Sequence, residues 1–417
     1  MVSDGAATET ILLRGGLVID GLGSDPVENG SVLIADGFIQ EVGRSIVAPA
    51  GAIVIDCQGS SILPGLIDAH VHVGATMVDF GNQSKLKPSS LIALEMAGRL
   101  RHMLDVGYTT IRDCGGADWG FKEAVRTGIV EGPEVIISGS ILSQTGGHGD
   151  MRHRGEPGGE ITDHDTFGMI FSVADGRSAL RRAVREQIRL GADFIKVMAS
   201  GGAASPTDKL ERAQYSLEEL SLIVEEAARN GLYVAMHALP LVAIRQAIDA
   251  GAHTVEHGNF LDDETATYMV QHDVALIPTV ATYVMASRHP EKYSDPPEVV
   301  AKIGLAADGA MRAVESAYRQ GVMVGSGSDL LGDEISWLPH EHELRAEIVG
   351  SSLAIKAATS VNADILQRPD LGRLVPTCRG DVVVVAGNPL ENISILARNS
   401  YVRAVVKGGR LWRHTAQ

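Results

Sequence analysis

The chain has few aromatic residues and only three cysteines. Phe, Trp and Tyr make up 4 % of its 417 residues, and Cys57, Cys114 and Cys378 lie far apart without a C-x-x-C pair. An odd number of widely spaced cysteines argues against a disulfide framework. We expect reduced, buried thiols in a cytoplasmic protein.

Long basic runs and long apolar runs are also missing. The formal net charge is −16, and the most basic stretch is the short patch at residues 152–154. This balance argues against nucleic acid as a partner, because phosphate groups attract basic surfaces. No apolar run approaches membrane-spanning length, and the first five residues lack the basic and apolar regions of a signal peptide. We therefore expect no membrane partner.

Glycine, in contrast, is abundant, with 47 residues, which suits a fold with many tight connections between strands and helices. Hydrophobic residues make up 45 % of the chain and charged residues 21 %, as is usual for a globular protein. The length is sufficient for one large domain and a smaller one.

Both ends of the chain are rich in short predicted β-strands. These strands are expected at 11–13, 16–20, 31–35, 38–42 and 53–56, and again at 381–385, 402–407 and 410–412. Asp36-Gly37 and Gly408-Gly409 are typical of tight hairpin turns. We predict that residues 1–64 and 371–417 combine into one small β-sandwich.

The middle of the chain, residues 65–370, alternates between strands and helices. Strands are predicted at 66–73, 109–113, 134–138, 194–198, 233–237, 254–256, 275–278 and 323–326. Helices are predicted from Ser178 to Leu190 and from the Ser216/Glu219 capping box to about Asn230. Eight such units predict an α/β fold of the (β/α)₈ TIM-barrel type. A doubly wound sheet is the alternative. That fold would be expected to have a glycine-rich phosphate-binding turn after its first strand, where this chain has histidines.

His70 and His72 stand at the end of the first predicted barrel strand. Side chains two residues apart on a strand point to the same side, so both imidazoles can bind one metal ion. A solvent-exposed face of a strand would show the same spacing. The residues at the ends of later strands therefore decide between the two interpretations.

Those later strands carry Lys196, His237, His257 and Asp329, each near the end of its own strand. In a barrel, functional groups lie at the carboxyl ends of the strands. Lys196 is flanked by apolar residues on both sides, and burial disfavours the charged form of a lysine. A single histidine would more often be a packed core residue, but two at consecutive strand ends favour metal binding.

Together these residues resemble the metal site of the amidohydrolase superfamily. The stretches 107–113, 143–150 and 255–258 are similar to the branch that contains imidazolonepropionase-like proteins and metal-dependent prolidases. That branch also holds an ochratoxin-type amidase and phenylurea hydrolases. The resemblance covers essentially the whole chain, including the β-sandwich built from both ends.

The resemblance implies two divalent metal ions per chain, with zinc expected. His70 and His72 would hold one ion with Asp329, His237 and His257 would hold the other, and a carbamate formed from CO₂ on Lys196 would bridge them. A metal-bridging hydroxide would attack a C–N amide bond. Asp329 would then carry the proton to the leaving nitrogen.

Four further residues are candidates for substrate binding. His148 lies in a glycine-flanked loop and is expected to act in catalysis or to contact substrate, although an ordinary loop histidine is the alternative. Arg152, with Arg154 nearby, could place a guanidinium over the pocket mouth; Leu239 would form an apolar wall, and Tyr283 could line the pocket. Asp68 could orient a metal ligand or make a structural ion pair.

The substrate is predicted only by class. A hydrophobic wall opposite a guanidinium suits a dipeptide or an N-acyl amino acid with a hydrophobic part. A urea or carbamate of the phenylurea type is the first alternative, and a cyclic amide or a deaminase substrate is the second. An inactive barrel would be expected to lack ligands that this chain retains. We expect a small-molecule substrate and a homo-oligomer.

Overall fold

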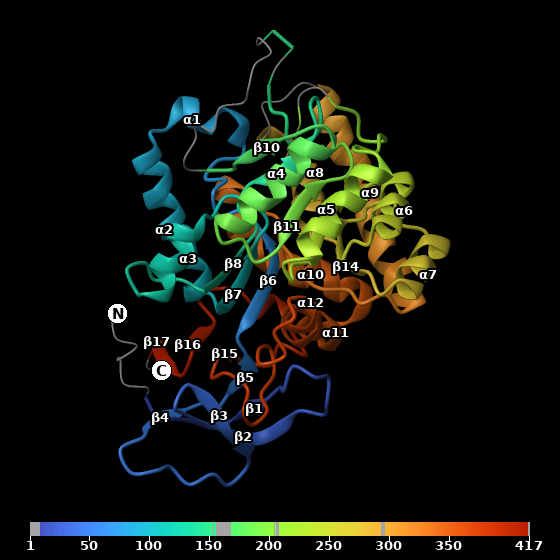
Figure 1. The fold of residues 1–417 in the computed structure, drawn as a ribbon. Coiled ribbons are helices and arrows are strands. Elements are labelled where there is room, and N and C mark those ends of the chain that lie inside the picture. Colours follow the sequence, from blue (N-terminus) through green and yellow to red (C-terminus); the bar gives the residue numbers. More distant parts are fainter. Residues whose placement is uncertain are drawn as a thin grey trace.

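The computed structural model describes residues 9–152, 154–155, 168–203, 205, 208–292 and 297–415. Strands from the two ends of the chain lie together on one side of the molecule, and the alternating strands and helices form the larger part (Figure 1). No helix among the described residues is long and apolar enough to cross a lipid bilayer.

The terminal strands form one mixed sheet of eight strands. Its members are β1 (Ile11–Val18), β2 (Val27–Ala35), β3 (Phe38–Gly43), β4 (Ile53–Asp56), β5 (Ser60–Pro64), β15 (Val382–Ala386), β16 (Val402–Lys407) and β17 (Arg410–His414). The order is β17-β16-β15-β5-β1-β2-β3, with β4 paired to β1. This joining of both ends in one sheet agrees with the sequence analysis, which missed β5 and divided β1 into two strands.

Side-chain alternation and turn chemistry explain this sheet. Val382, Val384, Ala404 and Val406 are buried in a core that they share with N-terminal residues such as Ile62. Between β2 and β3, Asp36 and Gly37 both have positive φ, 54° and 84°, as a two-residue hairpin turn of this type requires. The predicted Asp-Gly turn is therefore present.

The middle of the chain forms two parallel sheets. The first contains β6 (Leu66–Val71), β7 (Tyr108–Asp113) and β8 (Glu134–Ile137) in that order. The second contains β10 (Phe171–Val173), β9 (Ile141–Ser143), β11 (Ile195–Met198), β12 (Val234–Ala238), β13 (Thr254–His257) and β14 (Ala275–Ile277). Seven of the eight predicted strands are present, and the short β9 and β10 were not predicted.

Helices follow these strands and lie outside them (Figure 1). They are α1 (Gln83–Leu86), α2 (Ser89–Asp105), α3 (Trp119–Arg126), α4 (Gly176–Arg189), α5 (Leu217–Ala228), α6 (Leu241–Ala250), α7 (Asp263–Gln271), α8 (Val280–Arg288), α9 (Pro297–Gln320), α10 (Leu338–Val349), α11 (Ser351–Lys356) and α12 (Asn362–Ile365). The predicted capping box opens α5, with Ser216 and Glu219 bonded reciprocally. The fold is therefore α/β with parallel sheets.

The eighth predicted strand, at 323–326, is not a regular strand in the structure. It makes one isolated parallel bridge, between Val324 and Leu276. The side chain of Asn362 also bonds this segment: its Oδ1 accepts from Ser326 N at 2.9 Å, and its Nδ2 donates to Ser326 O at 2.8 Å and to Ile67 O at 2.7 Å. A side-chain amide thus satisfies backbone groups that strand pairing would otherwise satisfy.

We predict that Asn362→Ala lowers the free energy of unfolding by about 2–4 kcal/mol, because it removes the side-chain partner of the buried Ser326 N and Ile67 O. Chemical denaturation followed by circular dichroism would measure the change. Asn230→Ala is the control, since Asn230 is exposed and makes one bond to Glu226 O. Equal effects from the two substitutions would show that Asn362 does not hold this segment.

Candidate functional site

Six side chains from different elements meet at the carboxyl ends of the parallel strands. His70 lies in β6 and His72 just beyond it; the structure ends this strand at Val71, two residues earlier than predicted. The other four are Lys196 in β11, His237 in β12, His257 at the end of β13, and Asp329 after the bridge segment. The structure therefore brings together all six residues that the sequence analysis proposed as ligands.

The distances within this group are short. Asp329 Oδ1 lies 3.4 Å from His72 Nε2 and 3.7 Å from His70 Nε2, and Asp329 Oδ2 lies 3.8 Å from His257 Nδ1. The ring centroids of His70 and His257 are 4.9 Å apart, and those of His237 and His257 are 4.6 Å apart. Lys196, His237, His257 and Asp329 line the same cavity.

Burial keeps these imidazoles neutral, which is the form that binds metals. It lowers the pKa of His72 to about 3 and holds the pKa values of His70, His237 and His257 well below the usual value. Burial also raises the pKa of the Asp329 carboxyl to about 8, against the opposing effect of Lys196. Neutral nitrogen donors beside one carboxylate suit a divalent cation such as zinc.

Two buried polar atoms at the centre of the group have no hydrogen-bond partner within the described part of the chain. They are His70 Nε2 and Lys196 Nζ. A buried nitrogen without a partner costs free energy, so a folded protein normally satisfies it with some other group. A cation beside His70 and an acidic modification of Lys196 would both meet this need. The donor set therefore fits the divalent metal ions and the Lys196 carbamate that the resemblance implies.

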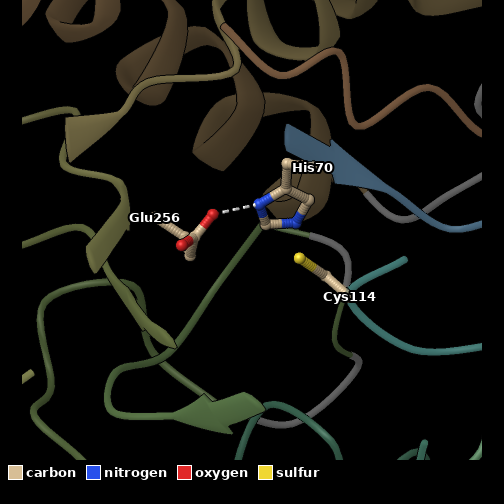
Figure 2. A group of neighbouring side chains, drawn as sticks. All are labelled: His70, Cys114 and Glu256. Atoms are coloured by element: carbon tan, nitrogen blue, oxygen red, sulfur yellow. Dashed lines mark hydrogen bonds and ion pairs between the residues drawn. The ribbon is translucent and has the colours of Figure 1, made fainter. Parts of the chain in front are cut away.

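The outer nitrogen of His70 is held by a buried ion pair. Its Nδ1 lies 2.5 Å from Glu256 Oε2 (Figure 2). Arg112 Nη2 in turn donates to both Glu256 oxygens at 2.8 Å. Arg112 also donates through Nη1 to Thr254 Oγ1 at 3.2 Å. A carboxylate that accepts from one histidine nitrogen leaves the other nitrogen as an acceptor for metal.

Cys114 lies beside His70 and Glu256, and the three together have the composition of a small metal site (Figure 2). Burial, however, raises the pKa of the Cys114 thiol to about 12. A thiol that stays protonated is a poor ligand. The Nδ1 of His70 is also engaged by Glu256. Within this second group, Glu256 therefore serves to orient His70.

The sequence analysis missed Glu256 and Arg112. Both are fully buried within strands whose other residues are mainly apolar or small. Like Lys196, each is a charged residue inside a strand, but Asp113 follows Arg112 and His257 follows Glu256, so their neighbours in sequence are less apolar. Their pairing joins β7 to β13, and only the three-dimensional structure reveals it.

The remaining candidate residues divide into two groups. His148 and Tyr283 line the cavity: the His148 ring stacks on His237 at 4.5 Å, and the Tyr283 ring meets the edge of His257 at 5.7 Å. Arg152 instead pairs with Asp150 through Nε and Nη2, at 2.7 and 2.6 Å, and is not part of the cavity lining.

Leu239 and Asp68 also lie away from the cavity surface. Leu239 is fully buried and packs behind Tyr283 and Ile303, which do line the cavity. The predicted apolar wall at Leu239 is therefore replaced by other residues. Asp68 Oδ1 accepts from the backbone nitrogens of His70 and Ser328 at 3.1 and 3.0 Å. It thereby fixes the backbone on both sides of the ligand group.

The cavity has about 980 Å³ of free space, counting the part open to solvent. Away from the ligand group its walls are mainly apolar, with Val78, Phe80, Met151, Met169, Phe171 and Ile303 among the lining residues. Among the described lining residues there is no arginine, and the one lysine is Lys196. This volume and lining suit a small molecule with a hydrophobic part.

Comparison with known proteins agrees with this geometry. Residues 61–412 match the model of the amidohydrolase family. The chain is 33 % identical to ochratoxinase of Aspergillus niger over 425 aligned positions, which cover 96 % of this chain and 86 % of that protein.

Two solved structures are also similar. A prolidase complexed with N-methylphosphonate-L-proline is 39 % identical, with a TM-score of 0.94 over 97 % of this chain and 100 % of that one. A Xaa-Pro dipeptidase with bound methionine is 26 % identical, with a TM-score of 0.84 over 97 % and 100 %.

We predict that Glu256→Gln weakens zinc binding by roughly 10- to 100-fold, because an amide holds the Nδ1–H of His70 less strongly than a carboxylate does. Competition with a fluorescent chelator would measure the affinity. Glu264→Gln removes an exposed carboxylate that pairs with Arg245 and is the matched control. Unchanged zinc affinity in a folded Glu256→Gln protein would exclude this role.

Proposed function

The chain belongs to the amidohydrolase family and is a hydrolase of carbon–nitrogen bonds, and we propose that it is a metal-dependent enzyme that cleaves the amide bond of a dipeptide or an N-acyl amino acid with a hydrophobic part. The observation that carries the proposal is that His72, Lys196, His237, His257 and Asp329 line one cavity with largely apolar walls, and that the buried His70 lies directly beside Asp329.

We propose that the two parallel sheets close into a (β/α)₈ barrel over residues 65–370. Backbone hydrogen bonds on both sides support closure: Asp193 N donates to Ile137 O at 2.7 Å, and Ala69 N donates to Ser326 O at 2.9 Å. Residues 1–64 and 371–417 would then form a separate composite domain, with the terminal sheet folded as a small β-sandwich around its own core.

We assign the metal ligands by their position around the cavity. His70, His72 and Asp329 would hold one divalent cation, His237 and His257 a second, and Lys196 would bridge them as a carbamate. Bound zinc would polarise the substrate carbonyl and lower the pKa of water so that it can attack at neutral pH. The unpartnered atoms His70 Nε2 and Lys196 Nζ support this assignment.

The protein's own groups would position the substrate and move the proton. Asp329 would take a proton on a carboxylate oxygen and deliver it to the leaving nitrogen, a role that suits a buried carboxyl whose pKa is raised towards neutrality. His148 would contact the substrate beside His237. The apolar walls would hold the hydrophobic part and limit the entry of water.

A neutral urea or carbamate is the second candidate substrate. The observation that favours it is the position of Arg152, whose guanidinium is held by Asp150 instead of lining the cavity. A carboxylate-bearing substrate would gain about 1.5–3 kcal/mol from a charged hydrogen bond to an arginine. Without such a contact, a carboxylate-bearing substrate does not gain this binding free energy over a neutral one.

A substrate screen tests the proposed function. Zinc-loaded protein would be incubated with dipeptides, N-acyl amino acids and aryl ureas, in parallel with Asp329→Asn. We expect turnover of hydrophobic amides, with kcat in the variant roughly 10²–10⁴ lower and KM less affected. Turnover of ureas alone would favour the second candidate. Equal turnover by both proteins would exclude Asp329 as the proton carrier.

Lys196→Ala tests the bridge. We predict that it loses most activity and at least one bound metal, because the carbamate is the only anionic bridge in the proposed site. Metal analysis of the purified protein, with activity measured in the presence and absence of short carboxylic acids, would report both effects. Retention of two metals and of wild-type kcat would contradict the assignment.

A further inference from the structure

A buried polar cluster lies behind His148 and has no part in the ligand group. The Nδ1 of His148 is 2.8 Å from Ser205 Oγ, and Ser205 Oγ donates a short hydrogen bond to Asp208 Oδ1. All three residues come from segments that border the cavity, and the side chain of Asp208 is only 3 % exposed. The three side chains form a chain of hydrogen bonds that leads from the interior to the substrate cavity.

The direction of these bonds fixes the tautomer of His148. Serine has one hydroxyl proton, and here that proton is donated to the Asp208 carboxylate. The Ser205 oxygen can therefore only accept from His148, so the proton of the imidazole is on Nδ1. The opposite nitrogen, Nε2, makes no hydrogen bond with the described protein residues and belongs to a ring that lines the cavity. In a neutral imidazole that nitrogen is an acceptor.

The charge of Asp208 is already compensated by other groups. Its Oδ2 accepts from Gly202 N and from Gln214 Nε2, both at 3.1 Å, and Lys302 Nζ lies 3.8 Å from Oδ1. The same Oδ2 lies 3.7 Å from His148 Nδ1, so the nearest partner of that nitrogen is the Ser205 hydroxyl, at 2.8 Å.

Packing prevents the ring from turning over. One face of His148 stacks on His237, with centroids 4.5 Å apart and an angle of 29° between the planes. The ring also lies against Gly202, where a Cβ atom would stand only 2.2 Å from Cε1 and 2.3 Å from Nε2 of the ring. Only glycine fits there, so the backbone and His237 together clamp the imidazole.

We propose that Ser205 and Asp208 are positioning residues that hold the Nδ1–H of His148, so that Nε2 accepts a hydrogen bond from an N–H or O–H group of the substrate close to the scissile bond. This inference rests on the proposed function and narrows the substrate class: it favours molecules that carry such a donor, for example the α-amino group of a dipeptide, over analogues that lack it.

Nitrogen NMR of protein labelled in its histidines tests the positioning directly, with or without a known substrate. At mildly alkaline pH, the His148 signals, assigned by their loss in His148→Gln, should show the proton on Nδ1. Ser205→Ala should shift the ring towards the Nε2–H tautomer, whereas Ser205→Thr, which keeps the hydroxyl, should not. A proton on Nε2 in the wild-type protein would overturn the proposal.

Matched substrates test the consequence. Wild-type enzyme should prefer leucyl-proline to 4-methylpentanoyl-proline, which lacks only the α-amino group, by roughly ten- to a hundredfold in kcat/KM. Ser205→Ala and Asp208→Asn should reduce this preference, with little change for the analogue. Ser200→Ala removes a buried hydroxyl that bonds Leu239 N, away from His148, and should retain the preference.

The outcomes separate this inference from the proposed function. If neither proline compound is hydrolysed, the same comparison is made with a donor-bearing substrate from the screen and its analogue without the donor. Equal losses on both members of a pair in Ser205→Ala and Asp208→Asn would contradict the acceptor role even in an active amidohydrolase. Absence of all amide hydrolysis would refute the proposed function, and the NMR result would still decide the positioning.

Discussion

The buried ion pair between Arg112 and Glu256 is the interaction on which the centre of this molecule depends. Arg112 belongs to the sheet of β6, β7 and β8, whereas Glu256 belongs to the six-stranded sheet. The guanidinium donates to Ala69 O at 2.5 Å and to both carboxylate oxygens, and the carboxylate in turn holds His70. One pair therefore joins the two sheets and orients a residue of the site.

Such a pair is tolerable in the interior only while both partners are present and hydrogen-bonded. Removing one leaves a buried, uncompensated charge, which typically costs about 3–5 kcal/mol. Backbone strain is found close by: His257, Thr279 and Asp329 all have positive φ, at 73°, 44° and 52°. His257 Nδ1 lies 2.7 Å from Thr279 Oγ1, so two of these strained residues hold each other. The surrounding strands and this ion pair stabilise an arrangement that isolated segments would not adopt.

Local patterns in the sequence were sufficient to predict most of the strands and six side chains that the structure brings together. The period of two in β6, the apolar surroundings of Lys196 and the histidines at the ends of β12 and β13 all concern neighbours along the chain. Features that depend on distant partners were not predictable in this way. Asn362 bonds the backbone of Ser326 in the segment predicted as the eighth strand, and Leu239 packs in one cluster with Tyr283 and with Ile303 of α9. Arg152 could have been suspected, because its partner Asp150 lies only two residues away.

The pairing of β5 with β15 has a consequence for biosynthesis. Strand β5 leads through the single residue Gly65 into β6, which carries the first histidine of the site, and Gly65 N donates to Asp381 O. Strand β5 thus lies between β1 and a partner some three hundred residues further along the chain. While the chain emerges from the ribosome, this edge of β5 stays unpaired until β15 has been synthesised. Folding that relies on such distant contacts is slow and leaves strand edges open to aggregation. The yield of native protein should therefore depend on chaperones and on the rate of synthesis more than the stability of the finished fold would suggest.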